Sequence, residues 1–299
     1  MKIGGIYKNG ATSLVVETNR GTLDVAEAGK RYKMNIPTTM KALIEAGAEG
    51  KSAVADLVEA VQGEGNSDLY LLDGTYSWAP ILNNPEKIIC VGLNYRKHAI
   101  ETCNPIPERP ILFSKFNNAL AGHGSEVMIP PDALEPDYEA ELAIVIGKEC
   151  HTISEDNALK FVFGYAVAND ISARDLQMVT SQWLLGKTCD NFAPIGPYVV
   201  TADAVPDPND LRITCTRNGI VVQDSNTNDM IFNCKQIIGY CSRFFTLKPG
   251  DIILTGTPEG VIMGLPKKYQ VWLQPGDHVV TSIDGIGELE FSVGADKGD

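Results

Sequence analysis

The 299-residue chain lacks the features of several common protein classes. Its longest apolar runs, such as residues 142–147, are far too short to cross a bilayer, and its N-terminus lacks the apolar core of a signal peptide. Lys and Arg total only 25 against 38 Asp and Glu, which gives a net charge of −13. We expect neither a nucleic acid nor a membrane partner for so acidic a chain, because both require cationic surface.

Cysteine pairs and nucleotide-binding motifs are also missing. The seven cysteines are odd in number, form no CxxC pair and have no regular spacing, so we interpret them as reduced thiols of a cytoplasmic protein. The glycine-containing segments at Gly92 and at 255–261 have neither a P-loop lysine nor a GxGxxG pattern, so we expect no nucleotide cofactor. The hydrophobic content of 44% is typical of a soluble globular protein.

Short β-like segments separated by turn residues dominate most of the chain. Asn218-Gly219, between two such segments, predicts a tight hairpin. Because strands outnumber helices and do not alternate with them, the sequence predicts a mainly β (α+β) fold and not a doubly wound parallel sheet. The chain becomes polar and rich in Pro and Asn around residues 80–85. We therefore predict a small α+β domain over 1–82 and a larger, mainly β domain over 83–299.

Helical periodicity is confined to a few segments. Apolar residues share one helical face over 40–44 and again over 54–61, with glycines between them, and Ser52 is predicted to cap the second helix. Two further helices are predicted over 155–163 and 231–245.

Three acidic residues at the ends of apolar strands are the first candidates for chemistry. Glu139 and Glu141 lie two apart at the start of a strand, so they project from the same face, and Asp170 ends another strand. Neighbouring carboxylates repel unless a cation or a shared proton lies between them. Without a paired His or Cys, the three predict an all-oxygen site suited to Mg²⁺, Mn²⁺ or Ca²⁺. The alternatives are solvated acids, a capping role for Asp170, or a metal-free Glu139–Glu141 dyad that shuttles a proton.

Other polar residues are suited to acid–base or electrostatic roles. His98 and Glu101 would face the same way on one helical turn, so that the carboxylate could orient the imidazole as a general base. Lys187 follows a glycine and could reach a developing anion, and backbone N–H groups and hydroxyls of 255–261 could bind a carboxylate. The alternatives are a surface histidine, a surface lysine, a tight turn and, at Arg174–Asp175, a surface ion pair.

Taken together, these segments resemble the fumarylacetoacetate hydrolase family over about residues 88–293. The resemblance rests on the order and number of short motifs, chiefly Gly92-Leu93-Asn94-Tyr95 with His98 and Glu101, Glu139-Ala140-Glu141-Leu142, Asn169-Asp170 through Gln177, Gly186-Lys187, and Leu254-Thr255-Gly256-Thr257-Pro258. It implies a distorted mixed β-roll that usually forms a homodimer, preceded here by the small N-terminal domain.

The resemblance also implies a role for each matching side chain. The implied metal ligands, for Mg²⁺ or Mn²⁺ and sometimes Ca²⁺, are Glu139, Glu141 and Asp170. The implied catalytic residues are the His98–Glu101 dyad and Lys187, and the implied substrate-binding residues are Gln177 and Thr257. The implied substrate is a small 2-oxo acid.

We therefore expect a metal-dependent enzyme that hydrolyses the carbon–carbon bond of an acylpyruvate or a related 2,4-dioxo acid. In this interpretation His98, oriented by Glu101, deprotonates water, while the metal and Lys187 stabilise the departing pyruvate enolate. The same enolate would serve an oxaloacetate decarboxylase, or an isomerase or tautomerase of an unsaturated 2-oxo diacid, so these activities stay open. A protein that binds a 2-oxo acid without catalysis is the non-enzymatic alternative.

Overall fold

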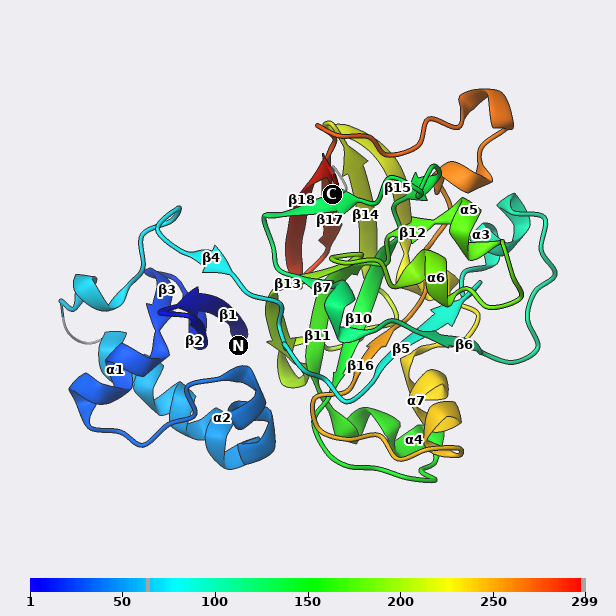
Figure 1. Ribbon diagram of the computed structural model, residues 1–299. Coiled ribbons are helices and arrows are strands. Elements are labelled where there is room, and N and C mark those ends of the chain that lie inside the picture. The colour runs from blue at the N-terminus through cyan, green and yellow to red at the C-terminus, as the bar shows by residue number, and fades with distance from the viewer. Residues whose placement is uncertain (63–64, 297–299) are drawn as a thin grey trace.

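The computed structural model describes residues 1–62 and 65–296 (Figure 1). Within these residues, eighteen strands form three sheets of 11, 5 and 2 strands. The strands are β1 (Lys2–Lys8), β2 (Ala11–Thr18), β3 (Gly21–Asp24), β4 (Ser77–Trp78), β5 (Ile88–Gly92), β6 (Ile111–Ser114), β7 (Leu120–Ala121), β8 (Ser125–Ile129), β9 (Pro136–Asp137), β10 (Ala140–Ile146), β11 (Val162–Asn169), β12 (Ser172–Ala173), β13 (Ala193–Thr201), β14 (Arg212–Arg217), β15 (Ile220–Asn226), β16 (Ile252–Leu254), β17 (His278–Ile283) and β18 (Gly287–Ala295).

The helices are few, and most of them are short. They are α1 (Val25–Tyr32), α2 (Met40–Gln62), α3 (Arg96–Glu101), α4 (Glu155–Ala158), α5 (Arg174–Gln177), α6 (Leu184–Lys187) and α7 (Cys234–Ser242). This is the mainly β, α+β architecture predicted from the sequence. Among the described residues, none of the helices has the length and apolar character that crossing a membrane requires.

The N-terminal region packs α1 and α2 against the antiparallel strands β1–β3 (Figure 1, blue). The apolar positions of α2 are buried, as their periodicity predicts. The helix is kinked at Gly47, whose φ of +59° only glycine adopts at little cost. Ser52 lies inside the second half of α2, so the prediction that it caps a helix is wrong, because the break falls earlier at Gly47.

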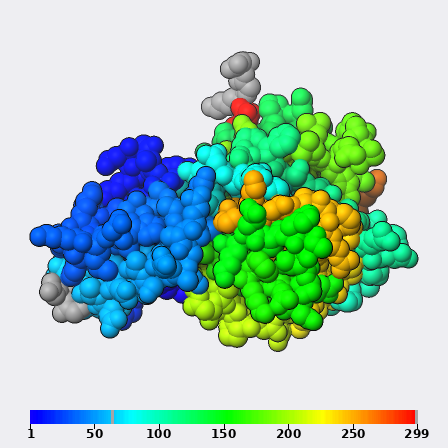
Figure 2. All heavy atoms as spheres, turned by 90° about the horizontal axis from the view of Figure 1, so that it is seen from below, coloured from blue at the N-terminus to red at the C-terminus, as the bar shows by residue number. Residues whose placement is uncertain are grey.

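The 11-stranded sheet joins the N-terminal region to the rest of the chain. Its main path is β3-β2-β1-β13-β11-β10-β16-β5-β6, and β1 pairs with β13 in the register Lys2↔Val200 and Ile3↔Val199. Figures 1 and 2 show the two parts side by side. A domain boundary at residue 82 stays a prediction, and any such boundary divides strands that share one sheet.

Strands β10 and β11 lie in the middle of this sheet and end at the candidate site. Every residue of both strands is buried. Leu142, Ile144 and Ile146 pack into one hydrophobic core, whereas Ala143 and Val145 pack into another on the opposite face. A strand covered on both faces explains why the sequence of β10 is an uninterrupted apolar run.

The five-stranded sheet, ordered β15-β14-β17-β18-β8, packs beside the main sheet. Asn218 and Gly219 form the β14–β15 turn with φ values of +53° and +78°, which confirms the predicted hairpin. The buried carboxylate of Asp277 accepts a hydrogen bond from Asn218 Nδ2 at 2.7 Å and pairs with Arg217 at 2.5 Å. These contacts fix the turn to the loop that precedes β17.

The two helices predicted in the C-terminal region exist but are shorter than expected. Helix α4 ends at Ala158 and continues as a single 3-10 turn to Phe161. Helix α7 begins after Asn233, whose side chain forms a reciprocal capping box with Gln236. Ser154 occupies the position before α4 but makes no side-chain capping bond there.

Candidate active site

Three buried carboxylates converge where β10 begins and β11 ends. Glu139, Glu141 and Asp170 each offer an oxygen, and these oxygens lie within 4.8 Å of one another. The strand pairing explains the convergence, because Ala140 lies opposite Asn169 and the N–H of Asp170 donates to the carbonyl of Glu139 at 2.9 Å. The alternative that these acids are solvated surface groups is therefore wrong.

Three cationic side chains surround these carboxylates. Lys187 Nζ lies 2.6 Å from Glu139 Oε2 and 2.9 Å from Asp170 Oδ2. Arg174 contacts Glu139 Oε1 at 2.7 Å, and Lys115 Nζ contacts Asp170 Oδ1 at 2.6 Å. All three cations are buried, so Lys187 is not a surface lysine and Arg174 does not form a surface pair with Asp175.

Glu141 differs from the other two acids because, within the described residues, it forms no ion pair. It accepts a hydrogen bond from Gly256 N–H at 2.6 Å. Burial raises the pKa of Glu141 well above its usual range, and the charges of Asp170 and Glu139 raise it further. Burial alone would also raise the pKa of Glu139, but Lys187 and Arg174 outweigh it and lower that pKa to about 2.

Negative charge exceeds positive charge around the three carboxylates, which makes the cluster suited to a divalent cation. With Asp137, which pairs with Arg174 at 2.9 Å, four buried carboxylates face three cationic side chains. A divalent ion beside Glu141 would remove the repulsion that raises its pKa. The ligand set contains only carboxylate oxygens, which hard cations such as Mg²⁺ and Mn²⁺ prefer.

The predicted histidine–glutamate dyad is formed on α3. His98 Nδ1 lies 2.8 Å from Glu101 Oε1, and His98 is buried, which excludes a solvated surface histidine. The other oxygen of Glu101 accepts the N–H of Gly260 at 2.9 Å. Gly264 packs so closely that a Cβ there would lie 2.6 Å from the Glu101 carboxyl carbon. The carboxylate is thus held from two sides, and it in turn fixes the imidazole.

A cavity of about 100 Å³ brings these groups together. It is lined by the implied metal ligands Glu139 and Glu141, by His98 of the dyad, and by the implied substrate-binding residues Gln177 and Thr257. Lys187, Phe113 and Trp183 complete this part of the lining. Gln177 Oε1 accepts a hydrogen bond from Arg174 Nη1 at 3.0 Å, and Thr257 Oγ1 accepts one from Gln223 Nε2 at 2.9 Å.

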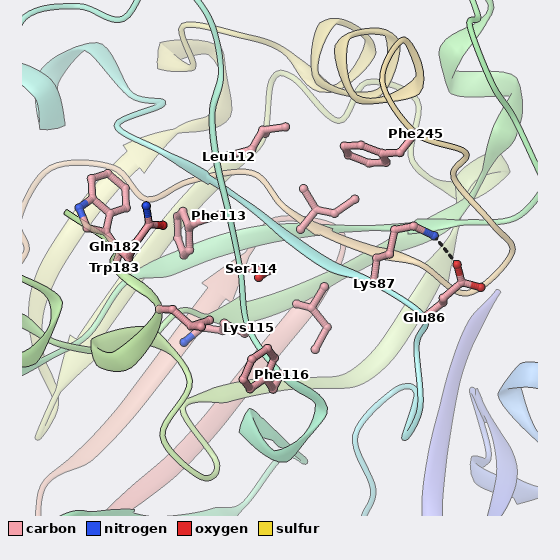
Figure 3. A pocket seen from close by; sticks show the side chains of 13 residues that line it. Glu86, Lys87, Leu112, Phe113, Ser114, Lys115, Phe116, Gln182, Trp183 and Phe245 are labelled. Carbon is pink, nitrogen blue, oxygen red and sulfur yellow. Dashed lines mark hydrogen bonds and ion pairs between the residues drawn. The ribbon is translucent and has the colours of Figure 1, made fainter. Parts of the chain in front are cut away.

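A larger cavity of about 590 Å³ shares Phe113 and Trp183 with the smaller one (Figure 3). The two rings stack edge to face with centroids 5.4 Å apart, and a Cβ at Gly92 would lie 2.4 Å from the Trp183 ring. Glu86 and Lys87 form an ion pair at its far wall. Because the three carboxylates do not line this larger cavity, the smaller cavity is the candidate active site.

Sequence reasoning assigned no role to several residues that hold this site together. Lys115 directly follows β6, and its ammonium also donates to the carbonyls of Ile171 at 3.0 Å, Phe192 at 2.9 Å and Lys187. Asp137 accepts the N–H groups of Ile262 and Met263 in addition to its pair with Arg174. In the sequence, neither residue differs from the many charged residues that lie on protein surfaces.

Comparisons with known proteins find similar sequences and structures. Residues 87–294 match the model described as fumarylacetoacetate (FAA) hydrolase C-terminal. The chain is 44% identical to the mitochondrial oxaloacetate tautomerase of Xenopus laevis, over 88% of this chain and 80% of that protein.

Two solved structures are similar over nearly their whole length. The fumarylacetoacetate hydrolase of the psychrophile Exiguobacterium antarcticum has a TM-score of 0.80 and 32% identity, covering 99% of this chain and 100% of that one. The maleylpyruvate hydrolase of Sphingobium, in complex with manganese(II) and pyruvate, has a TM-score of 0.78 and 28% identity, again covering 99% and 100%.

Proposed function

Because the chain belongs to the fumarylacetoacetate hydrolase family, we propose that it is a metal-dependent tautomerase that interconverts the enol and keto forms of oxaloacetate. The similarity to the oxaloacetate tautomerase of Xenopus laevis supports this activity. Carbon–carbon hydrolysis, the reaction first expected from the sequence, becomes the second candidate. A tautomerase of an unsaturated 2-oxo diacid was among the alternatives left open, with oxaloacetate considered only as the substrate of a decarboxylase.

The observation that carries the proposal is the meeting of His98 and the acidic cluster in one cavity. His98 lines the same 100 Å³ cavity as Glu139 and Glu141. Glu139, Glu141 and Asp170 would hold Mg²⁺ or Mn²⁺, and the bound cation would supply a Lewis acid that polarises the 2-oxo group of the substrate. The dyad supplies the base that such a polarised group requires.

The cavity also presents hydrogen-bond donors to an anionic substrate. An arginine can only donate, so the contact between Arg174 Nη1 and Gln177 Oε1 leaves the amide nitrogen of Gln177 free to donate to another group. Gln177 and Thr257 are the side chains to which we assign the substrate carboxylate. A lining that offers donors favours a carboxylate over a neutral or cationic group.

His98 moves the proton, and Lys187 supplies a fixed positive charge. Burial lowers the pKa of Lys187, but the charges of Asp170 and Glu139 outweigh burial and raise that pKa, so the ammonium stays charged. In the tautomer that carries its proton on Nδ1, His98 donates to Glu101 and presents Nε2 as the base. In ketonisation Nε2 of His98 accepts the proton of the enol hydroxyl and then delivers that proton to C3; the reverse steps give the enol. Lys187 stabilises the negative charge that develops on the C2 oxygen.

The test follows the enol absorbance of oxaloacetate in the ultraviolet. We expect Mg²⁺ or Mn²⁺ to support ketonisation faster than the uncatalysed rate, and excess chelator to abolish the acceleration. His98→Ala should lower the rate at least about 100-fold, because a positioned acid–base group contributes that much, while the Mn²⁺ affinity stays unchanged. No acceleration with metal bound would refute the proposal, and a parallel loss of Mn²⁺ affinity in His98→Ala would refute the role of His98.

Hydrolysis of an acylpyruvate is supported by the similarity to the maleylpyruvate hydrolase that binds manganese(II) and pyruvate. In that reaction His98 would deprotonate water instead of a carbon. Pyruvate release from acetylpyruvate, measured beside the tautomerase assay, separates the two activities. The homodimer and the cytoplasmic location stay predictions from the sequence.

A further inference from the structure

We propose that Gln223 is a positioning residue that fixes the direction of the Thr257 hydroxyl, so that this hydroxyl donates a hydrogen bond into the active-site cavity. The acceptor is a carboxylate oxygen of the substrate, so the inference rests on the proposed function. Among the described residues, the Gln223 side chain forms hydrogen bonds to Ala140, Thr257 and Pro258 and to none of the three carboxylates. It acts by deciding which way a neighbouring proton points.

The orientation of the Gln223 amide is fixed at both ends. Gln223 lies on β15 and is buried. Its Oε1 accepts the backbone N–H of Ala140 at 3.0 Å, and a backbone N–H can only donate. Its Nε2 donates to the carbonyl of Pro258 at 3.0 Å, and a carbonyl can only accept. The oxygen and nitrogen of this amide therefore cannot exchange places without losing both bonds.

The second amide proton sets the polarity of Thr257. Gln223 Nε2 also lies 2.9 Å from Thr257 Oγ1, so the threonine oxygen accepts this bond. A hydroxyl has one proton, and that proton must then point elsewhere. The structure records no acceptor for it among the described residues, and Thr257 lines the cavity beside His98 and Lys187. A buried donor that faces a cavity favours an anionic acceptor there.

Gln223 also touches the strand that carries the acidic cluster. Ala140, whose N–H it accepts, lies between Glu139 and Glu141. If Gln223 only held the structure together, replacing it would therefore disturb the metal site as well as Thr257. Metal affinity and anion affinity must be measured separately to distinguish the two roles.

The test uses oxalate, a dianion that is not turned over, titrated calorimetrically into the Mn²⁺-loaded full chain. In Gln223→Glu the carboxylate accepts but cannot donate, so the Thr257 hydroxyl turns toward it and the cavity loses a donor. We expect oxalate to bind about 10- to 100-fold more weakly, the range for one hydrogen bond to a charged group. Thr257→Val should show a similar loss, whereas Thr257→Ser, which keeps the hydroxyl, should bind oxalate more tightly than Thr257→Val.

The double variant decides the question. If Gln223 acts through the Thr257 hydroxyl, Gln223→Glu should cause no further loss of oxalate affinity in the Thr257→Val background. An equal further loss there would show that the added charge or a distorted cavity is responsible, and would overturn the proposal. Unchanged oxalate affinity in Gln223→Glu would overturn it as well, and so would a loss of Mn²⁺ affinity that accounts for the whole effect.

A second variant and the tautomerase assay keep the possible outcomes distinct. If Gln223→Glu does not fold, Gln223→Met removes the donor without adding charge. Gln223→Met should weaken oxalate binding in the wild-type background and cause no further weakening in the Thr257→Val background. Oxalate coupling with no tautomerase activity would leave this inference intact while refuting the proposed function. Wild-type protein that binds Mn²⁺ but not oxalate would refute the inference, because no anion would then meet the Thr257 hydroxyl.

Discussion

Replacing Lys115 with methionine removes a fully buried cation on which two parts of the site depend. The ammonium pairs with Asp170 Oδ1 at 2.6 Å, and both side chains are 0% exposed. It also donates to the backbone carbonyls of Ile171, Lys187 and Phe192. These contacts tie the end of β11 to the end of α6, which carries Lys187. Methionine has a similar length, so the substitution deletes the charge and the donors while leaving little empty volume.

The expected loss of stability is large on the scale of one residue. Removing one partner of a buried ion pair costs about 3–5 kcal/mol, because the other charge stays buried. Asp170 keeps its contact with Lys187, which favours the lower end of that range. Folded proteins are stable by only about 5–15 kcal/mol, so Lys115→Met would remove a substantial share. With a denaturant slope of about 3 kcal/mol per molar urea, the midpoint should fall by roughly 1 M.

Urea denaturation of the metal-free protein measures this shift. Lys30→Met is the matched control, because the Lys30 ammonium lies 3.1 Å from Glu27 at an exposed position and its loss should leave the midpoint nearly unchanged. Saturating Mn²⁺ should reduce the deficit of Lys115→Met, since a cation beside Asp170 replaces part of the lost charge. A shift no larger than that of Lys30→Met would refute the assignment of Lys115 as a structural cation of the site.

Two further outcomes test other parts of the structure. Gly92→Ala places a Cβ 2.4 Å from the ring of Trp183, so the ring must move. We expect a shifted tryptophan fluorescence spectrum and a raised KM, and an unchanged spectrum would contradict this packing. Burial alone would raise the pKa of Asp277, but the hydrogen bonds that its carboxylate accepts, first of all from Arg217, outweigh burial and lower that pKa below its usual range. The stability advantage of wild type over Asp277→Asn should therefore be present above about pH 4 and disappear as the pH falls further, which urea midpoints at neutral and acid pH measure; an advantage independent of pH would contradict it.

Local patterns in the sequence predict those features that depend on neighbouring residues. The apolar run of β10 predicts a strand buried on both faces, and Asn218-Gly219 predicts its hairpin. The spacing of His98 and Glu101 predicts a hydrogen bond across one helical turn, and the structure contains it. Such features need only a few consecutive residues, so their physics is visible in a short window.

The sequence does not reveal partners that are distant along the chain. Arg174 on α5 reads as a surface residue because its partner Asp137 lies on β9, and Lys115 gains its role only when the end of β11 folds against it. The pairing of β1 with β13 has the same origin. Ser52 shows that a local preference can also mislead. Serine favours the cap position of a helix, but here the helix breaks earlier, at Gly47. In each case tertiary contacts outweigh the local preference.

The first strand of the chain cannot complete its pairing until residues near Val200 have been synthesised, because they form its partner strand. At about 5–20 residues per second, translation imposes a delay of roughly 10–40 s. The hairpin of β1 with β2 can form during that interval, but the outer edge at Lys2–Gly4 stays open to pairing with another nascent chain. Strand β13 then closes this edge and in the same event covers β11, which leads to Asp170. The synthesis of one late strand thus closes the exposed edge of β1 and ties the start of the chain to the strand beside β11.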